Sequence, residues 1–150
     1  MNGGYERDTV TRLETNLDDC PPELLGAVMQ RLLDAGALDV WFTPIQMKKN
    51  RPGVLLTVLC AEADADKFSE LMLRETTAFG VRRTIAERRK LRREFATAKT
   101  KFGNVTVKLG RLNGRVIQAA PEFESCKKVA AEKKVPLRQV YEAASKASLK

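Results

Sequence analysis

Runs of apolar residues divide the first part of the chain into six predicted elements. Alternating apolar positions indicate strands, a continuous apolar run indicates a buried strand, and stripes with helical spacing indicate helices. The strands are expected at residues 7–15, 38–47 and 54–60 and after Gly80, and the helices up to Gly36 and over 63–77. The order βαββαβ predicts a ferredoxin-like antiparallel sheet with two helices on one face.

A second, smaller unit is predicted for the rest of the chain. Two alternating runs joined through Gly103 predict a β-hairpin, and Asn113-Gly114 predicts a turn into a third strand. Two helices should follow, with Pro136 opening the second. Their expected ranges are 121–134 and 136–148. The predicted fold class is therefore α+β: a ferredoxin-like subdomain over 1–93, then a subdomain of a β-hairpin or three strands plus two helices over 94–150.

The distribution of charge along the chain suggests an anionic partner. The net charge is +8, and it is uneven: residues 1–60 hold six basic and eight acidic side chains, whereas residues 61–150 hold 21 basic and 11 acidic ones. Phosphates, nucleic acid or an acidic surface would suit the second part, while a solvated basic surface is the alternative. No apolar run is long enough for a membrane span and no secretory signal precedes the first strand, so we expect a cytoplasmic location and no membrane partner.

Histidine is absent and the three cysteines are widely spaced, which limits the chemistry. Cys20, Cys60 and Cys126 form no CxxC pair, so the sequence argues against a disulfide framework and a structural zinc site. Without histidine, a Ser-His-Asp or Cys-His nucleophile is excluded within this chain. A metal held by these residues alone should prefer oxygen ligands, as magnesium and manganese do.

Two polar motifs follow the first and third predicted strands. In ETNLDD, the side chains of Asn16, Asp18 and Asp19 could hold a divalent ion that bridges a polyphosphate. Capping of the next helix by Asp18 or Asp19 is the simpler alternative. In MKKNRPG, a tight turn places several cations together and could hold phosphates, although a solvated turn is equally compatible. Its candidate nucleotide-binding residues are Lys48, Lys49 and Arg51.

Two further motifs surround Gly80. RETTAFGVR offers hydroxyls and cations to phosphate or sugar oxygens, although a helix C-terminus repels anions and the cations must outweigh it. Its candidate nucleotide-binding residues are Arg74, Thr76, Thr77 and Arg82. The run from Arg82 to Arg93 holds seven basic residues and one acid, a composition that nucleic-acid binders share. It has no interleaved aromatic residues, which argues against stacking on bases.

Taken in order, the motifs closely resemble the C-terminal region of the LarC family. The resemblance runs from about Thr11 to Ala144 and is carried by ETNLDD, TPIQMKKNRPG, RETTAFGVRR and a C-terminal PEFESC…VPLRQVYEAA. It implies a part in CTP-dependent insertion of nickel into pyridinium-3,5-bisthiocarboxylic acid mononucleotide. The product is the pincer cofactor of lactate racemase.

The resemblance also implies roles for the motifs. Asn16, Asp18 and Asp19 would hold the metal of a CTP complex with magnesium or manganese, and nickel would be the transferred metal. The cations and hydroxyls named above would hold the nucleotide, and no catalytic residue is assigned. The implied partners are the cofactor precursor and an N-terminal LarC region that this chain lacks. We also expect a homo-oligomer, a trimer or hexamer, and no nucleic-acid partner.

Two departures from the family pattern and two alternatives remain. Cys20-Pro21-Pro22 stands where relatives often have Met and a small residue, and Ala120-Pro121 where Lys-Pro is common, which removes a possible cation. The alternatives are a ferredoxin-like regulatory or oligomerisation module that binds a small anion, and a basic nucleic-acid-binding domain. Fold alone does not choose between them.

Overall fold

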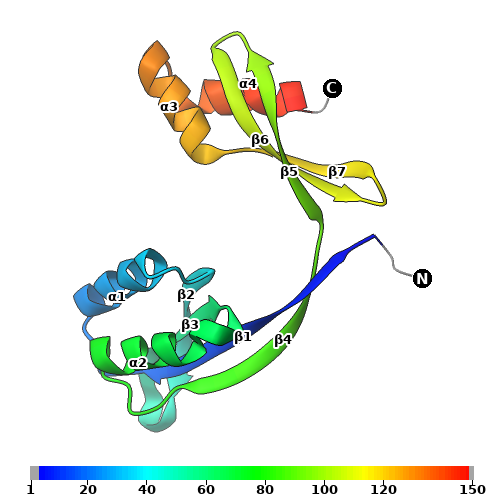
Figure 1. Cartoon of the computed structure of the whole chain (residues 1–150). Coiled ribbons are helices and arrows are strands. Elements are labelled where there is room, and N and C mark those ends of the chain that lie inside the picture. The colour runs from blue at the N-terminus through cyan, green and yellow to red at the C-terminus, as the bar shows by residue number, and fades with distance from the viewer. Residues whose placement is uncertain (1–3, 149–150) are drawn as a thin grey trace. The chain divides into compact units, whose positions relative to one another are not determined.

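The computed structural model describes residues 4–148 and contains the expected elements (Figure 1). The first six are β1 (Glu6–Leu17), α1 (Pro22–Asp34), β2 (Asp39–Met47), β3 (Arg51–Cys60), α2 (Ala65–Glu75) and β4 (Arg82–Lys90). The last five are β5 (Arg92–Thr100), β6 (Gly103–Leu112), β7 (Arg115–Pro121), α3 (Phe123–Lys133) and α4 (Leu137–Ser148). Short 3₁₀ turns, η1 (Lys48–Asn50) and η2 (Glu62–Asp64), precede β3 and α2.

The first unit, residues 7–88, has the ferredoxin-like arrangement predicted from the sequence. Its sheet has the order β2-β3-β1-β4, and β3 pairs antiparallel with both β1 and β2. The pairing places Leu17 opposite Val54 and Met47 opposite Arg51. The C-terminal end of β1 therefore lies at the same end of the sheet as the β2–β3 turn.

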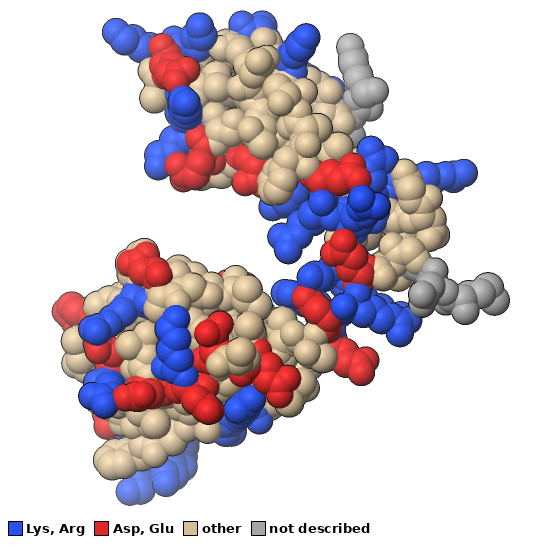
Figure 2. All heavy atoms as spheres, in the orientation of Figure 1, with Lys and Arg blue, Asp and Glu red and all other residues tan. Residues whose placement is uncertain are grey.

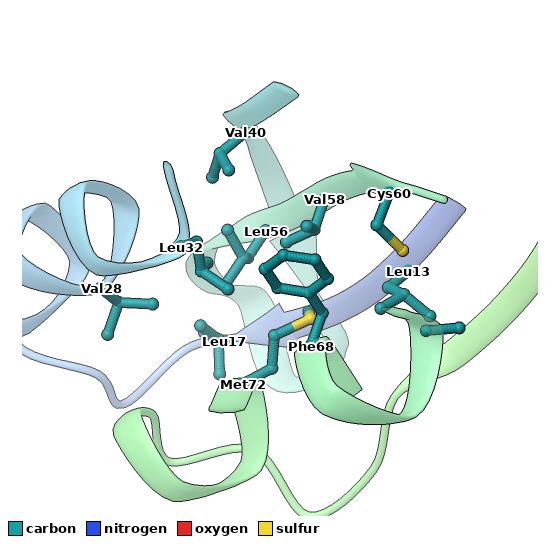
Figure 3. Packing of buried hydrophobic residues seen from close by; sticks show 11 residues of the cluster. Leu13, Leu17, Val28, Leu32, Val40, Leu56, Val58, Cys60, Phe68 and Met72 are labelled. Carbon is teal, nitrogen blue, oxygen red and sulfur yellow. The ribbon is translucent and has the colours of Figure 1, made fainter. Parts of the chain in front are cut away.

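Alternation along the strands builds the core of this unit. Leu13 and Leu17 of β1 lie on one face with Leu56 and Val58 of β3, and all four are buried. Phe68 of α2 packs into the same cluster (Figure 3) and is fully buried. Burial of a side chain this large contributes about 1.5–3 kcal/mol. The core thus holds the helices on one face and leaves the sheet ends free for polar residues.

The second unit joins residues 89–150 with the first six residues. Its three strands form an antiparallel sheet in the order β5-β6-β7. Gly103 and Gly114 have positive φ angles, as the two expected turns require. Buried residues of β6, α3 and α4 form its core: Val105, Cys126, Val129, Ala130, Val140 and Ala144. The sequence placed the boundary between residues 93 and 94, a few residues later in the chain.

The division sharpens the charge asymmetry. Residues 7–88 contain 11 basic and 13 acidic side chains, whereas the other unit contains 16 basic and six acidic ones. Both signs are interspersed on the faces in view (Figure 2). None of the helices in the described part of the chain is long and apolar enough to cross a membrane.

Candidate functional site

Three of the sequence motifs meet at one end of the four-stranded sheet. β1 ends there, the β2–β3 turn lies there, and the loop after α2 leads there into β4. Three side-chain contacts join these segments, each between residues far apart in the chain. The donor–acceptor pairs are Arg82 to Asn16 at 2.6 Å, Arg51 to Asp18 at 3.3 Å, and Thr77 to Asp19. We call Asn16, Asp18, Asp19, residues 48–51, Thr77 and Arg82 the charged end.

The helix-capping alternative for the two aspartates is wrong. The N-cap of α1 is Pro21, with no side-chain hydrogen bond to the helix, and Pro22 begins the first turn. A Pro-Pro start needs no side-chain acceptor at its first donor, because proline has no N–H. Asp18 and Asp19 are therefore free of any capping role and direct their oxygens to Arg51 and Thr77 instead.

The turn between β2 and β3 presents its cations to solvent. Lys48, Lys49 and Arg51 are exposed, and neither lysine has a hydrogen bond or ion pair within the described residues. Lys49 and Asn50 have positive φ angles of 61° and 55°. This conformation is costly for a residue with a β-carbon, and such strain is concentrated at functional sites.

Within the described part of the chain, Arg74 and Thr76 make no hydrogen bond or ion pair with the charged end. Arg74 pairs with Glu70 one turn earlier on the exposed face of α2. The Thr76 hydroxyl donates to the carbonyl of Met72 at 2.6 Å and accepts from the N–H of Ala78. Thr76 therefore shapes the end of α2, while Arg74 makes an exposed helical ion pair.

Gly53 is a residue whose importance the sequence did not reveal. A β-carbon at this position would lie 2.6 Å from the carbonyl oxygen of Leu17 and 3.1 Å from the sulfur of Met47. Only glycine allows β1 and β3 to approach so closely next to the charged end. In the sequence, Pro52-Gly53 has the composition of an ordinary turn. The backbone that lies close to Gly53 belongs to Leu17, 36 positions earlier in the chain, so only the pairing of β1 with β3 identifies the constraint.

The acidic residues suit a metal that arrives with its own ligands. Among residues 4–148, no three His, Cys, Asp or Glu side chains are grouped to hold an ion. The charged end offers two carboxylates and the amide of Asn16, whose oxygen already accepts from Arg82. Magnesium commonly uses one or two carboxylates together with phosphate oxygens and waters. The donor set fits such an ion, and it does not fit a closed protein cage.

Acidic partners interrupt the basic run of β4. Arg83 makes ion pairs with Glu62 and Asp66. Arg88 donates both Nε and Nη2 to the Asp8 carboxylate at 2.9 and 2.8 Å, and this hydrogen bonding raises the pKa of the guanidinium. Arg83 and Arg88 are therefore already paired with acidic side chains, which lowers the positive charge that the run can offer to nucleic-acid phosphates.

The cysteines make no disulfide, as expected from the sequence. Cys60 and Cys126 are buried, and burial raises the pKa of both thiols. Such thiols are weak nucleophiles and weak metal ligands near neutral pH, because the thiolate is the reactive form. Cys20 is partly exposed and packs against the core beside α1.

The chain is similar to nickel insertion proteins over nearly its whole length. The family model described as nickel insertion protein matches residues 1–141. A pyridinium-3,5-bisthiocarboxylic acid mononucleotide nickel insertion protein of Acetivibrio thermocellus is 51% identical over 142 residues, which cover 95% of this chain and 35% of that protein. A putative nickel insertion protein of Geobacter metallireducens is 50% identical, over 93% of this chain and 36% of that protein.

Solved structures agree with this relationship. LarC2, the C-terminal domain of a cyclometallase involved in the synthesis of the NPN cofactor of lactate racemase, matches with a TM-score of 0.90 and 43% identity, covering 97% of this chain and all of that one. A protein from Methanopyrus kandleri matches with a TM-score of 0.71 and 27% identity, covering 97% of this chain and 90% of that one. The chain spans about a third of the length of its curated relatives. It belongs to the nickel insertion protein family, the LarC family.

Proposed function

We propose that this chain is the C-terminal, CTP-binding part of a protein that inserts nickel into pyridinium-3,5-bisthiocarboxylic acid mononucleotide. The single observation that carries the proposal is the meeting of three motifs at the charged end, through contacts between residues 33 to 66 positions apart. The relationship to curated insertion proteins supplies the substrate, with nickel as the transferred metal. The cytoplasmic location expected from the sequence belongs to the same proposal.

The residues divide the work of binding a metal–nucleotide complex. Lys48, Lys49 and Arg51 are close enough in the chain to surround one polyphosphate, and cations placed around developing negative charge stabilise it. Asn16, Asp18 and Asp19 would hold magnesium or manganese, which would supply charge neutralisation to the bound nucleotide. Arg51 can leave the carboxylate of Asp18 for a phosphate, because the pair lies at the surface.

Thermal unfolding with each of the four nucleoside triphosphates, with and without magnesium or manganese, tests the proposal. CTP at about 100 times its dissociation constant should add about 2.7 kcal/mol to the free energy of unfolding, and the other nucleotides less. Equal stabilisation by all four would favour a general anion-binding module. No stabilisation by any of them would contradict nucleotide binding, and a preference for RNA or DNA would favour the basic nucleic-acid alternative.

Charge-removing variants locate the site. We expect Lys49→Ala and Arg51→Ala each to weaken CTP binding by about 10- to 100-fold, the loss of one charge-assisted hydrogen bond. Arg12→Ala is the matched control, because Arg12 lies on β1 opposite Leu59, away from the charged end. The CTP affinity of Arg74→Ala tests whether that arginine belongs to the site: weaker binding than wild type would place it there, and unchanged binding would exclude it. Unchanged CTP affinity in both turn variants would mean that the β2–β3 turn is an ordinary solvated turn with no role in nucleotide binding.

The homo-oligomer expected from the sequence is also part of the proposal. Light scattering on the purified chain, with and without CTP and magnesium, measures its mass directly. A trimer or hexamer is the expected result, and a monomer at all concentrations would contradict it.

A further inference from the structure

Phe79 is held fully in solvent by a loop that is otherwise anchored. Its side chain is as exposed as in an extended chain, at 104% relative exposure. Nearby residues behave differently, because Ala78, directly before the ring, and Val81, two residues after it, pack against the core of the first unit. The ring is therefore the apolar tip of the loop that joins α2 to β4.

Hydrogen bonds fix this loop on both sides of the ring. Before it, the N–H of Ala78 donates to the Thr76 hydroxyl at 3.1 Å. After it, the Thr15 hydroxyl of β1 donates to the carbonyl of Gly80 at 2.9 Å. Thr77, two residues before the ring, donates to Asp19 at the charged end. The backbone that carries Phe79 is thus tied to the same end of the sheet.

The charged end has no other aromatic surface. Within residues 7–88, Phe68 is buried and Phe42 packs against the same core. Trp41 is partly buried and lies near the start of the edge strand β2, at the other end of that strand from the β2–β3 turn. The residues of the charged end are all polar or charged, so they can bind phosphates and an ion, but none of them supplies an aromatic ring on which a base could stack.

We propose that Phe79 is the surface on which the base of the bound nucleotide stacks, while the cations of the charged end hold the phosphates. This inference rests on the proposed nucleotide binding. Stacking tolerates any base, because every base has a π-face. Phe79 therefore adds affinity for all nucleoside triphosphates alike, and the choice of cytosine comes from other contacts.

Calorimetric titration of the whole chain with CTP, UTP and inorganic triphosphate, each with magnesium, tests the inference. We expect Phe79→Ala to weaken CTP and UTP by about tenfold each, equal to about 1.4 kcal/mol. Inorganic triphosphate, which has no base, should bind Phe79→Ala and wild type equally. Phe79→Trp should keep or strengthen nucleotide binding. Phe95→Ala is the matched control, since Phe95 is also an exposed phenylalanine, at 67%, and lies in the other unit.

The outcomes separate this inference from the proposed function. Wild type that binds CTP, with Phe79→Ala binding it equally well, overturns stacking and leaves nucleotide binding intact. Equal loss of CTP and of triphosphate in Phe79→Ala means that the ring only shapes the loop, which also overturns stacking. Wild type that binds neither CTP nor triphosphate contradicts the proposed function itself.

Discussion

Two buried threonines on β1 differ in whether their hydroxyls are satisfied. Thr11 and Thr15 are both almost fully buried. The Thr15 hydroxyl donates to the carbonyl of Gly80, whereas the Thr11 hydroxyl has no partner among the described residues. A buried hydroxyl without a partner destabilises the folded state, because it loses its hydrogen bonds to water and forms none within the protein. The two positions therefore offer opposite responses to the same substitution.

Thr11→Val should raise the free energy of unfolding by about 1 kcal/mol, because valine has nearly the same shape and no hydroxyl to desolvate. Thr15→Val should lower it by about 1–2 kcal/mol, because the carbonyl of Gly80 loses its donor. Urea denaturation of both variants beside wild type measures the difference. If Thr11→Val is destabilising, the hydroxyl has a partner after all, such as a bound water.

The strained turn allows stability and binding to be separated at a single residue. Lys49→Gly should raise the free energy of unfolding by about 0.5–1 kcal/mol, because glycine adopts positive φ without a β-carbon clash. The same variant should bind CTP more weakly, because it removes a cation. Asn50→Gly is the control, since it relieves a positive φ without changing the charge. A loss of stability in Lys49→Gly would mean that the lysine side chain packs in the folded state.

At the scale of elements, close strand approach positions the charged end. Gly53→Ala should cost about 1–3 kcal/mol, because the new methyl group would press on the backbone carbonyl of Leu17 and push β1 from β3. Gly26→Ala is the control: Gly26 lies within α1 with open space around it, and alanine should stabilise the helix by about 0.5–1 kcal/mol. Thermal melts and CTP titration of both variants measure the effects, and a neutral Gly53→Ala would show that the strands can part without loss.

The elements themselves could be predicted because their signals are local. Apolar periodicity and turn residues such as Asn113-Gly114 act within a few positions, and the structure confirms the order βαββαβ and the three-strand, two-helix unit after it. Local signals were misleading at Asp18 and Asp19, because an acidic residue just before a helix commonly caps its N-terminus, and these two do not cap α1. The Pro-Pro start removed the need for that cap.

The partners at the charged end could not be predicted in the same way. Arg82 and Asn16 are 66 residues apart and meet because β4 lies beside β1 in the sheet. Gly53 matters because of a carbonyl on another strand. Such constraints depend on strand order and register, which the sequence specifies only through the whole fold. Resemblance to a family assigned the motifs to one site. The register of β1, β2 and β3 explains how residues far apart in the chain come to lie at the same end of the sheet.

For the whole molecule, the cations of the charged end lie on the unit that is slightly acidic overall. Residues 7–88 contain more acids than bases, so attraction of a nucleotide there must come from local placement of Lys48, Lys49, Arg51 and Arg82. The excess of positive charge resides in the other unit. The overall charge of +8 therefore reports on that second unit and says little about the candidate site.

The chain should bind the metal–nucleotide complex but fail to insert nickel alone. It has no histidine, and within its described residues no three His, Cys, Asp or Glu side chains are grouped so that they could hold a metal ion. Nickel favours nitrogen and sulfur ligands, whereas Asp18 and Asp19 suit magnesium or manganese. The curated relatives are about three times as long as this chain, so the remaining part of such a protein is the expected source of nickel ligands.

The assay incubates the purified chain with nickel, CTP, magnesium or manganese, and the bisthiocarboxylate mononucleotide, and follows activation of a racemase that needs the product. We expect no activation from the chain alone and activation when the N-terminal polypeptide of a longer relative is added. Arg51→Ala in the complemented reaction separates the two roles, because it should reduce product by weakening CTP binding while nickel uptake by the N-terminal polypeptide stays unchanged. Full activity from the chain alone would mean that its oxygen ligands and its one partly exposed thiol, Cys20, are sufficient to handle nickel.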